Sequence, residues 1–113
     1  MKYKSKYTVC NQMHKHASKK EARRCDELTI MEKQGLIKDL KQQPRINVLL
    51  PFRYKGKAIR GIDYIADFGY FDNDKKCFVI EDTKGYKTPV YQIKKKMLLN
   101  VMKTREDFLF IES

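Results

Sequence analysis

Two acids and a lysine lie in consecutive apolar runs of the sequence. Asp67 interrupts "DYIADFGYF", and "CFVIEDTKG" ends with Asp82 and Lys84 two residues apart. Two neighbouring carboxylates raise each other's pKa unless a cation lies between them. A hard divalent ion such as Mg²⁺ resolves that conflict, because it needs only one or two carboxylates together with waters and a substrate phosphate. A nearby lysine can orient or deprotonate an attacking water, so these residues indicate metal-assisted hydrolysis of a phosphodiester.

Strand geometry favours Asp82 over its neighbour Glu81 as the metal ligand. Successive side chains of an extended strand point to opposite faces. Asp82 therefore shares a face with Lys84, whereas Glu81 points the other way. If the preceding strand pairs with this one in a hairpin, Asp67 can lie beside Asp82 on the same face.

Two helices are predicted around these strands. Ser18-Lys19-Lys20-Glu21 has the form of a capping box, and Gly35 is a plausible stop, so we predict a helix over 18–34. Thr88-Pro89 is typical of a helix start, and we predict a second helix over 89–103. The apolar residues expected to face the core recur every three or four positions: Ala22, Cys25, Leu28 and Met31 in the first helix, and Val90, Ile93, Met97 and Val101 in the second.

The strands are predicted from β-rich runs bounded by turn residues. After a connector that ends at Gln43-Pro44, the segments 45–52, 58–71 and 77–82 should form an antiparallel meander, with a first turn around Gly56. A final strand over 107–112 follows the second helix, so a right-handed crossover should make it parallel to the third strand. The predicted order is α-β-β-β-α-β, an α/β fold with a mixed central sheet.

Length and charge limit the classes of function. With 113 residues the chain is expected to form one domain over 18–113, preceded by a basic arm over 1–17. Lys and Arg number 25 against 14 Asp and Glu, a formal net charge of +11. Such an excess indicates an anionic partner, with nucleic acid as the first expectation, an acidic membrane surface as the second and general solubility as the third.

The remaining composition indicates a cytoplasmic protein without a membrane span. No stretch approaches the roughly 20 apolar residues that a spanning helix needs, and the N-terminus lacks the apolar run of a signal peptide. The 3 cysteines are odd in number and widely spaced. We therefore expect neither a disulfide framework nor a Cys-rich zinc site, and a reducing cytoplasm as the compartment.

The arrangement of these motifs resembles the PD-(D/E)XK nuclease superfamily. Asp67 followed by Asp82-Thr83-Lys84 resembles its D…(D/E)-x-K signature, although Ala66 stands where the superfamily name has proline. The restriction-endonuclease-like core of that superfamily is α-β-β-β-α-β, the order predicted above. Small phage-encoded members show a similar succession of short motifs. The corresponding pieces here, over about residues 18–103, are "SKKEA", "QP", "YIADF", "EDTKG" and "YQIKKK".

The resemblance implies a metal site and an activity. Asp67 and Asp82 would bind Mg²⁺, for which Mn²⁺ would substitute, with Thr83 offering its carbonyl and Glu21 completing the shell through water. The alternative reading of Glu21 is a plain helix cap. Lys84 would activate or position the water.

The implied reaction is endonucleolytic cleavage of DNA, with branched DNA such as Holliday junctions as the implied substrate. Two symmetric cuts in a junction would require a homodimer. Phage recombination or packaging proteins are the implied partners, in the cytoplasm of a host cell. Two alternatives remain open, a non-catalytic DNA-binding module and a nuclease subunit that is active only within a larger complex.

Basic residues flank the predicted site on both helices. A lysine-rich helix is often only a solvated face, but here it directly follows the predicted site and could track phosphates. No base-reading motif is visible, so binding should depend strongly on salt and weakly on sequence. The residues predicted to contact DNA are Lys19, Lys20, Arg23, Lys87, Lys94, Lys95 and Lys96.

Overall fold

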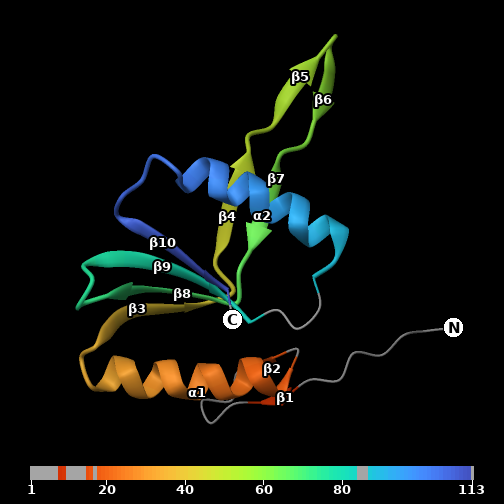
Figure 1. Ribbon diagram of the computed structural model, residues 1–113. Coiled ribbons are helices and arrows are strands. Elements are labelled where there is room, and N and C mark those ends of the chain that lie inside the picture. Colours follow the sequence, from red (N-terminus) through yellow and green to blue (C-terminus); the bar gives the residue numbers. More distant parts are fainter. Residues whose placement is uncertain (1–7, 10–14, 17, 84–86, 113) are drawn as a thin grey trace, which may run out of the picture.

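A mixed four-stranded sheet lies between two helices (Figure 1). The computed structural model describes residues 8–9, 15–16, 18–83 and 87–112. Neither helix in this part of the chain has the length and hydropathy of a membrane span. In chain order the elements are β1 (Thr8–Val9), β2 (Lys15–His16), α1 (Lys19–Lys33), β3 (Ile37–Gln42), β4 (Arg45–Leu49), β5 (Phe52–Tyr54), β6 (Lys57–Ile59), β7 (Ile62–Ile65), β8 (Phe68–Asp72), β9 (Cys77–Asp82), α2 (Pro89–Met102) and β10 (Phe108–Glu112).

The central sheet has the strand order β10-β9-β8-β3. β3 and β9 are both antiparallel to β8, and β10 is parallel to β9, as its connection through α2 predicts. The predicted mixed α/β fold is confirmed. The succession α1-β3-β8-β9-α2-β10 is the order of a restriction-endonuclease-like core.

The first helix follows its sequence signals closely. Ser18 caps α1, since its Oγ accepts a hydrogen bond from the backbone N–H of Glu21 at 3.1 Å. Gly35, with φ of +79°, follows its last turn in the left-handed conformation that terminates helices. The side chains of Ala22, Cys25 and Leu28 are buried against the sheet, as the spacing predicts.

The second helix begins as predicted but buries a different face. Thr88 Oγ1 accepts a hydrogen bond from the Tyr91 N–H at 3.0 Å. The prediction that Val90 and Ile93 face the core is wrong, because these side chains are 61% and 60% exposed. Leu98 is fully buried instead. Apolar residues occupy two adjacent rows of this helix. Met97 of the predicted row packs against the same cluster as Tyr91 and Leu98 of the other row, so the buried face is displaced toward the second row.

Residues 37–72 form one long, bent antiparallel ribbon. β3 pairs with β8, β4 with β7, and β5 with β6. At its tip Lys55 and Gly56 have φ of +49° and +77°, which is typical of a type I′ hairpin turn. The predicted turn around Gly56 is therefore confirmed, but three strand predictions were wrong. The expected strand 58–71 is divided into β6, β7 and β8. The expected strand 45–52 is divided between β4 and β5, and its expected place in the central sheet is taken by β3, which lies in the expected connector.

Proline and local backbone geometry explain the first bend in the ribbon. Pro44 has no N–H for a strand ladder, and Gln43 before it has a φ of +49°. The Pro44 ring lies over Gly69, where a Cβ would come within 3.0 Å of the Pro44 Cγ. The ribbon therefore leaves the central sheet after β3, and β4 and β7 pack beside α2 instead (Figure 1).

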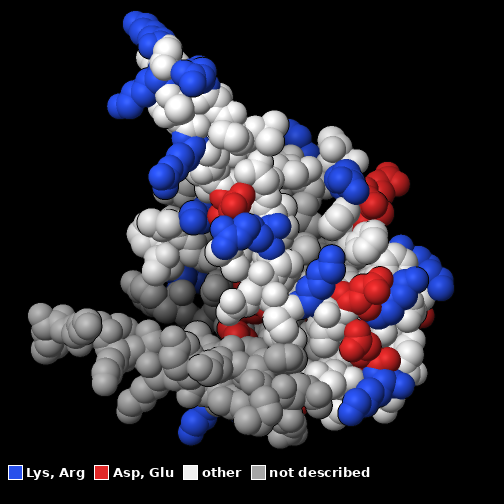
Figure 2. Space-filling view, turned by 180° about the vertical axis from the view of Figure 1, so that it is seen from behind, with Lys and Arg blue, Asp and Glu red and all other residues white. Residues whose placement is uncertain are grey.

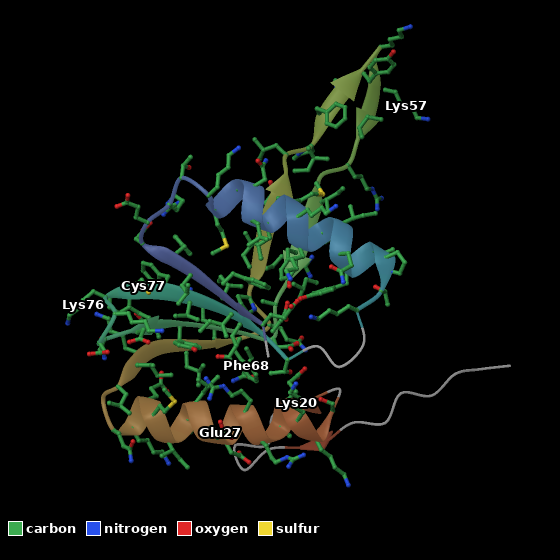
Figure 3. All side chains as sticks on the ribbon, in the orientation of Figure 1. Lys20, Glu27, Lys57, Phe68, Lys76 and Cys77 are labelled. Atoms are coloured by element: carbon green, nitrogen blue, oxygen red, sulfur yellow. The ribbon has the colours of Figure 1, made fainter. Side chains whose placement is uncertain are left out.

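Two apolar clusters hold the layers together. One lies between α1 and the sheet and includes Phe68, which Figure 3 labels, together with Val79. The other lies between α2, the opposite face of the sheet and the β4–β7 pair, and it includes Ile80 and Leu98. Consecutive residues of β9 thus enter different clusters, which is the alternation predicted for this strand.

Candidate functional site

The break between β7 and β8 brings Asp67 next to the end of β9. β8 and β9 pair Phe68 with Glu81, so the next position places Asp67 beside Asp82. The backbone N–H of Asp67 donates to Oδ1 of Asp82 at 2.9 Å. Oδ2 of Asp67 accepts hydrogen bonds from the Thr83 N–H at 2.7 Å and from Thr83 Oγ1 at 2.9 Å. The two predicted metal-binding aspartates therefore meet at one end of the sheet.

Burial and hydrogen bonds fix the orientation of both carboxylates. Asp67 is 7% exposed and Asp82 is 0% exposed. The hydroxyl of Tyr64, on β7, donates to Oδ2 of Asp82. The ribbon outside the central sheet thus takes part in holding the site.

Glu81 points to the opposite face and is engaged there. Its Oε2 lies 2.6 Å from Nε of Arg24, and its Oε1 accepts from Nη2 of Arg24 at 3.0 Å and from the Tyr70 hydroxyl at 2.7 Å. The hydrogen bond to Glu81 raises the pKa of Arg24. Burial, and then the hydrogen bond to Glu81, raise the pKa of Tyr70. Of the two acids at the end of β9, only Asp82 lies on the side of Asp67.

The first turn of α1 lies at the same end of the sheet. Arg24 reaches Glu81, and the Cys25 Sγ lies 3.5 Å from Nε2 of Gln42, whose strand position pairs with Phe68. Glu21, one turn earlier, is 5% exposed and so is buried at the Asp67 end of this layer. The structure brings Glu21 to the right end of the sheet, and its role in a metal shell stays a prediction.

An open pocket connects this end of the sheet with the surface. Its volume is about 420 Å³, and Glu81 and Arg24 line it together with Lys20, Arg23 and Thr83. The pocket therefore opens on the face of the sheet that carries Glu81, and Asp67 and Asp82 do not line it. Lys20, labelled in Figure 3, lies in the first turn of α1, and the neighbouring Lys19 is exposed. Predicted DNA-binding residues and Thr83 therefore share one concave surface, which lies on the face of the sheet opposite the Asp82 side chain. Lys84 lies outside the described residues, so its predicted role stays a prediction.

A third acid, Glu112, lies beside Asp82 and was missed by the sequence reasoning. β9 and β10 are parallel and pair Asp82 with Glu112, so the two side chains share a face. Its Oε1 lies 2.8 Å from Nζ of Lys87 and 3.1 Å from Nζ of Lys95, and Oε2 accepts from the Tyr91 hydroxyl. These contacts, that of Lys87 first, lower the pKa of Glu112 to about 2. The sequence signal that could have identified Glu112 is its position at the end of an apolar strand predicted to run parallel to β9.

Tyr91 links this acid to the aspartates. Its pKa is raised first by burial, then by the hydrogen bond to Glu112, and further by the charges of Asp82 and Asp67. Its ring centroid lies 6.3 Å from that of Tyr64.

The lysines of α2 that were predicted to contact DNA differ in exposure. Lys96 is exposed and Lys94 is half-buried. Two others, Lys87 and Lys95, pair with Glu112 at the site.

The donor set fits a hard divalent cation. Asp67, Asp82 and the carbonyl of Thr83 offer only oxygen atoms. Among the described residues, no group of three or more His, Cys, Asp or Glu is arranged to hold a metal ion. Zinc sites normally include His nitrogen or Cys sulfur, whereas Mg²⁺ prefers oxygen and is held by one or two carboxylates with waters and substrate oxygens. The residues present therefore fit Mg²⁺ better than Zn²⁺.

Comparison with known proteins gives one match. A family model described as "Protein of unknown function (DUF1064)" matches residues 1–108. No curated protein and no solved structure matches the chain.

Proposed function

We propose that this chain, which belongs to the DUF1064 family of proteins of unknown function, is a Mg²⁺-dependent endodeoxyribonuclease of the PD-(D/E)XK type. One observation carries the proposal. Asp67 and Asp82, both buried, are neighbours at the end of a mixed sheet with the strand order of a restriction-endonuclease-like core, and the Asp67 backbone N–H donates to Oδ1 of Asp82 at 2.9 Å. The D…D-x-K sequence to which they belong supports it. DNA is the proposed substrate because the net charge of the chain is +11.

The metal would be held by Asp67, Asp82 and the Thr83 carbonyl. When bound, Mg²⁺ supplies a Lewis acid for the phosphoryl oxygen and lowers the pKa of a coordinated water. The hydrogen bonds from Thr83 and Tyr64 would keep the carboxylates in place as substrate arrives. Pre-set orientation of this kind avoids reorganisation during the reaction, which is a large part of catalytic efficiency. Lys84 would position or deprotonate the attacking water.

The basic lining of the pocket would hold the DNA backbone. Lys20 and Arg23 line the pocket together with Thr83 and Glu81, so they would contact a phosphate that flanks the cleaved one on the α1 side. Lys87 and Lys95 are already paired with Glu112, so a phosphate contact from either lysine would compete with that acid. The α1 side of the site is therefore the stronger candidate for the first phosphate contacts.

The test compares carboxylate-to-amide variants at the site and away from it. Asp67→Asn and Asp82→Asn should lower Mg²⁺-dependent cleavage by at least about 100-fold, because each removes a charged metal ligand. Binding of the same DNA in EDTA should change little. Asp74→Asn is the matched control, since it removes the same charge from an exposed turn at the opposite end of β9. Thermal unfolding of each variant checks that it is folded.

Substrate choice is tested with a panel of a four-way junction, a flap, a linear duplex and a single strand. Preference for the junction, with two symmetric cuts and a dimer by light scattering, would establish the finer proposal of a resolvase acting in phage recombination. DNA binding with no cleavage under any divalent ion would instead identify a non-catalytic binding module. Activity that appears only after a recombination or packaging partner is added would identify a subunit of a larger complex.

A further inference from the structure

The β5–β6 hairpin projects from the body of the molecule beyond α2 (Figure 1). Each residue from 49 to 58 is exposed. The exposed side chains include Phe52 at 48% and Tyr54 at 61%. An isolated two-stranded hairpin is at best marginally stable, and this one buries almost nothing in return for its two strands. A ribbon of this kind contributes little to the fold, which favours a role in contacting a partner.

The charge of this hairpin has one sign only. Between residues 50 and 62 there are basic residues but no Asp or Glu. Figure 2 shows Lys and Arg gathered at the projecting tip, and Figure 3 labels Lys57 there. The basic side chains, all exposed, are Arg53, Lys55, Lys57 and Arg60.

The two faces of the hairpin differ in character. The register pairs Phe52 with Ile59 and Tyr54 with Lys57, so these four side chains share one face. Arg53 lies on the other face, and its Nη1 donates to the Gly56 carbonyl at 2.9 Å. The hairpin thus presents aromatic and aliphatic groups on one side and cations on both sides and at the turn.

We infer that the β5–β6 hairpin is an arm that binds duplex DNA away from the cleavage site. A two-stranded ribbon fits the major groove of B-DNA, which is about 12 Å wide. Cations on both faces can then reach the phosphates of either strand, and the aromatic face can pack on sugars and base edges. This inference rests on the proposed function, because the DNA that the arm binds is the DNA that the site would cleave.

A second copy of the chain fits this surface less well. Pairing two arms would bring four cations against four others, in a protein whose net charge is already +11. Repulsion of that kind opposes association at moderate salt. A polyanion, in contrast, gains the release of its condensed counterions for each phosphate neutralised.

The length of the ribbon limits where the arm can act. Gly56 and Asp67 are 11 positions apart in the sequence, and each residue rises about 3.3 Å, so the tip lies at most roughly 36 Å from the carboxylates. This is about one turn of B-DNA, or 10 base pairs. The arm should therefore contact the duplex up to one turn away from the cut.

The experiment measures DNA binding by fluorescence anisotropy in EDTA, from 50 to 300 mM salt, for the full chain. One variant replaces all four basic residues of the arm by Gln. The control replaces four exposed lysines around the opposite end of the sheet, Lys33, Lys38, Lys75 and Lys76, by Gln. Four lost phosphate contacts should lower the slope of log affinity against log salt by about 3.6 in the arm variant, with a clearly smaller change in the control.

Duplex length gives a second readout. On a four-way junction, whose branch point sets the position of the protein, the difference in affinity between the natural chain and the arm variant should vanish when each branch is shortened to a few base pairs, because the contacted phosphates are then missing. Equal salt slopes for arm and control variants would overturn the inference. A dimer that becomes monomeric in the arm variant, with DNA affinity unchanged, would also overturn it and would assign the arm to a second copy. Because nothing is cleaved in EDTA, failure here is separate from failure of the proposed activity.

Discussion

The ion pair of Glu81 with Arg24 provides a quantitative test of the different roles assigned to Glu81 and Asp82. Glu81 is assigned a structural role, and Asp82 is proposed to bind the metal. The Glu81 side chain is 1% exposed and that of Arg24 is 29% exposed. Arg24→Met would leave a buried carboxylate with the Tyr70 hydroxyl as its remaining partner among these contacts. Removing one member of a buried pair costs about 3–5 kcal/mol. Since Arg24 is partly exposed to water, we expect the free energy of unfolding to fall by about 3 kcal/mol. This is a large share of the roughly 5–15 kcal/mol by which a typical domain is stable.

The chain offers a matched control for this variant. Arg24 also contacts Glu27 at 2.9 Å, but the Glu27 side chain is 62% exposed. Glu27→Gln should therefore cost less than about 1 kcal/mol, as for other exposed pairs. The double variant Arg24→Met/Glu81→Gln should recover most of the loss, because it leaves no buried charge.

Urea unfolding followed by circular dichroism at pH 7 gives the free energies for the double-mutant cycle. A coupling energy below about 0.5 kcal/mol would refute the reasoning, since residues in one buried network couple more strongly. A loss for Arg24→Met no greater than that for Glu27→Gln would refute it as well. The cycle also separates stability from activity. Glu81→Gln should still cleave DNA, whereas Asp82→Asn should be folded and inactive, and the reverse result would make Glu81 the ligand.

Two further outcomes follow from single contacts. The pKa of Glu112 is lowered from 4.5 to about 2, chiefly by Lys87 and also by Lys95. The ionised acid therefore stabilises the fold fully at a pH above 4.5, and this contribution is lost as the pH falls toward 2. In urea unfolding, Glu112→Gln should thus be less stable than the natural chain at pH 7 and equal to it near pH 2, and a constant difference would contradict this. Gly61→Ala should lower thermal stability by about 1–3 kcal/mol, because its Cβ would lie 2.4 Å from the Leu49 carbonyl oxygen; Ala58→Ser, on the exposed hairpin, is the control.

Local sequence signals were sufficient to predict both helix starts and the central strand β9. Ser18 with its capping box and Thr88-Pro89 marked both helix starts, because capping depends on residues within one turn. The apolar run of β9 marked a central strand, and alternation along it separated Glu81 from Asp82. The meeting of Asp67 with Asp82 was also foreseeable, because a short turn forces β8 and β9 to pair.

Weak or ambiguous local patterns were resolved only by the tertiary structure. β3 was not predicted, because as an edge strand it fully buries only Ile37 and so shows little alternation. The face of α2 that packs inward was misjudged, because apolar residues line two adjacent rows and only contact with the sheet sets the buried face.

Contacts between distant residues also required the folded structure. Glu112 comes beside Asp82 through the register of two parallel strands, which no short turn fixes. Arg24 reaches Glu81 across 57 residues of sequence. Such pairings depend on the relative position of whole layers, which is set by packing of the entire core and not by any local pattern of residues.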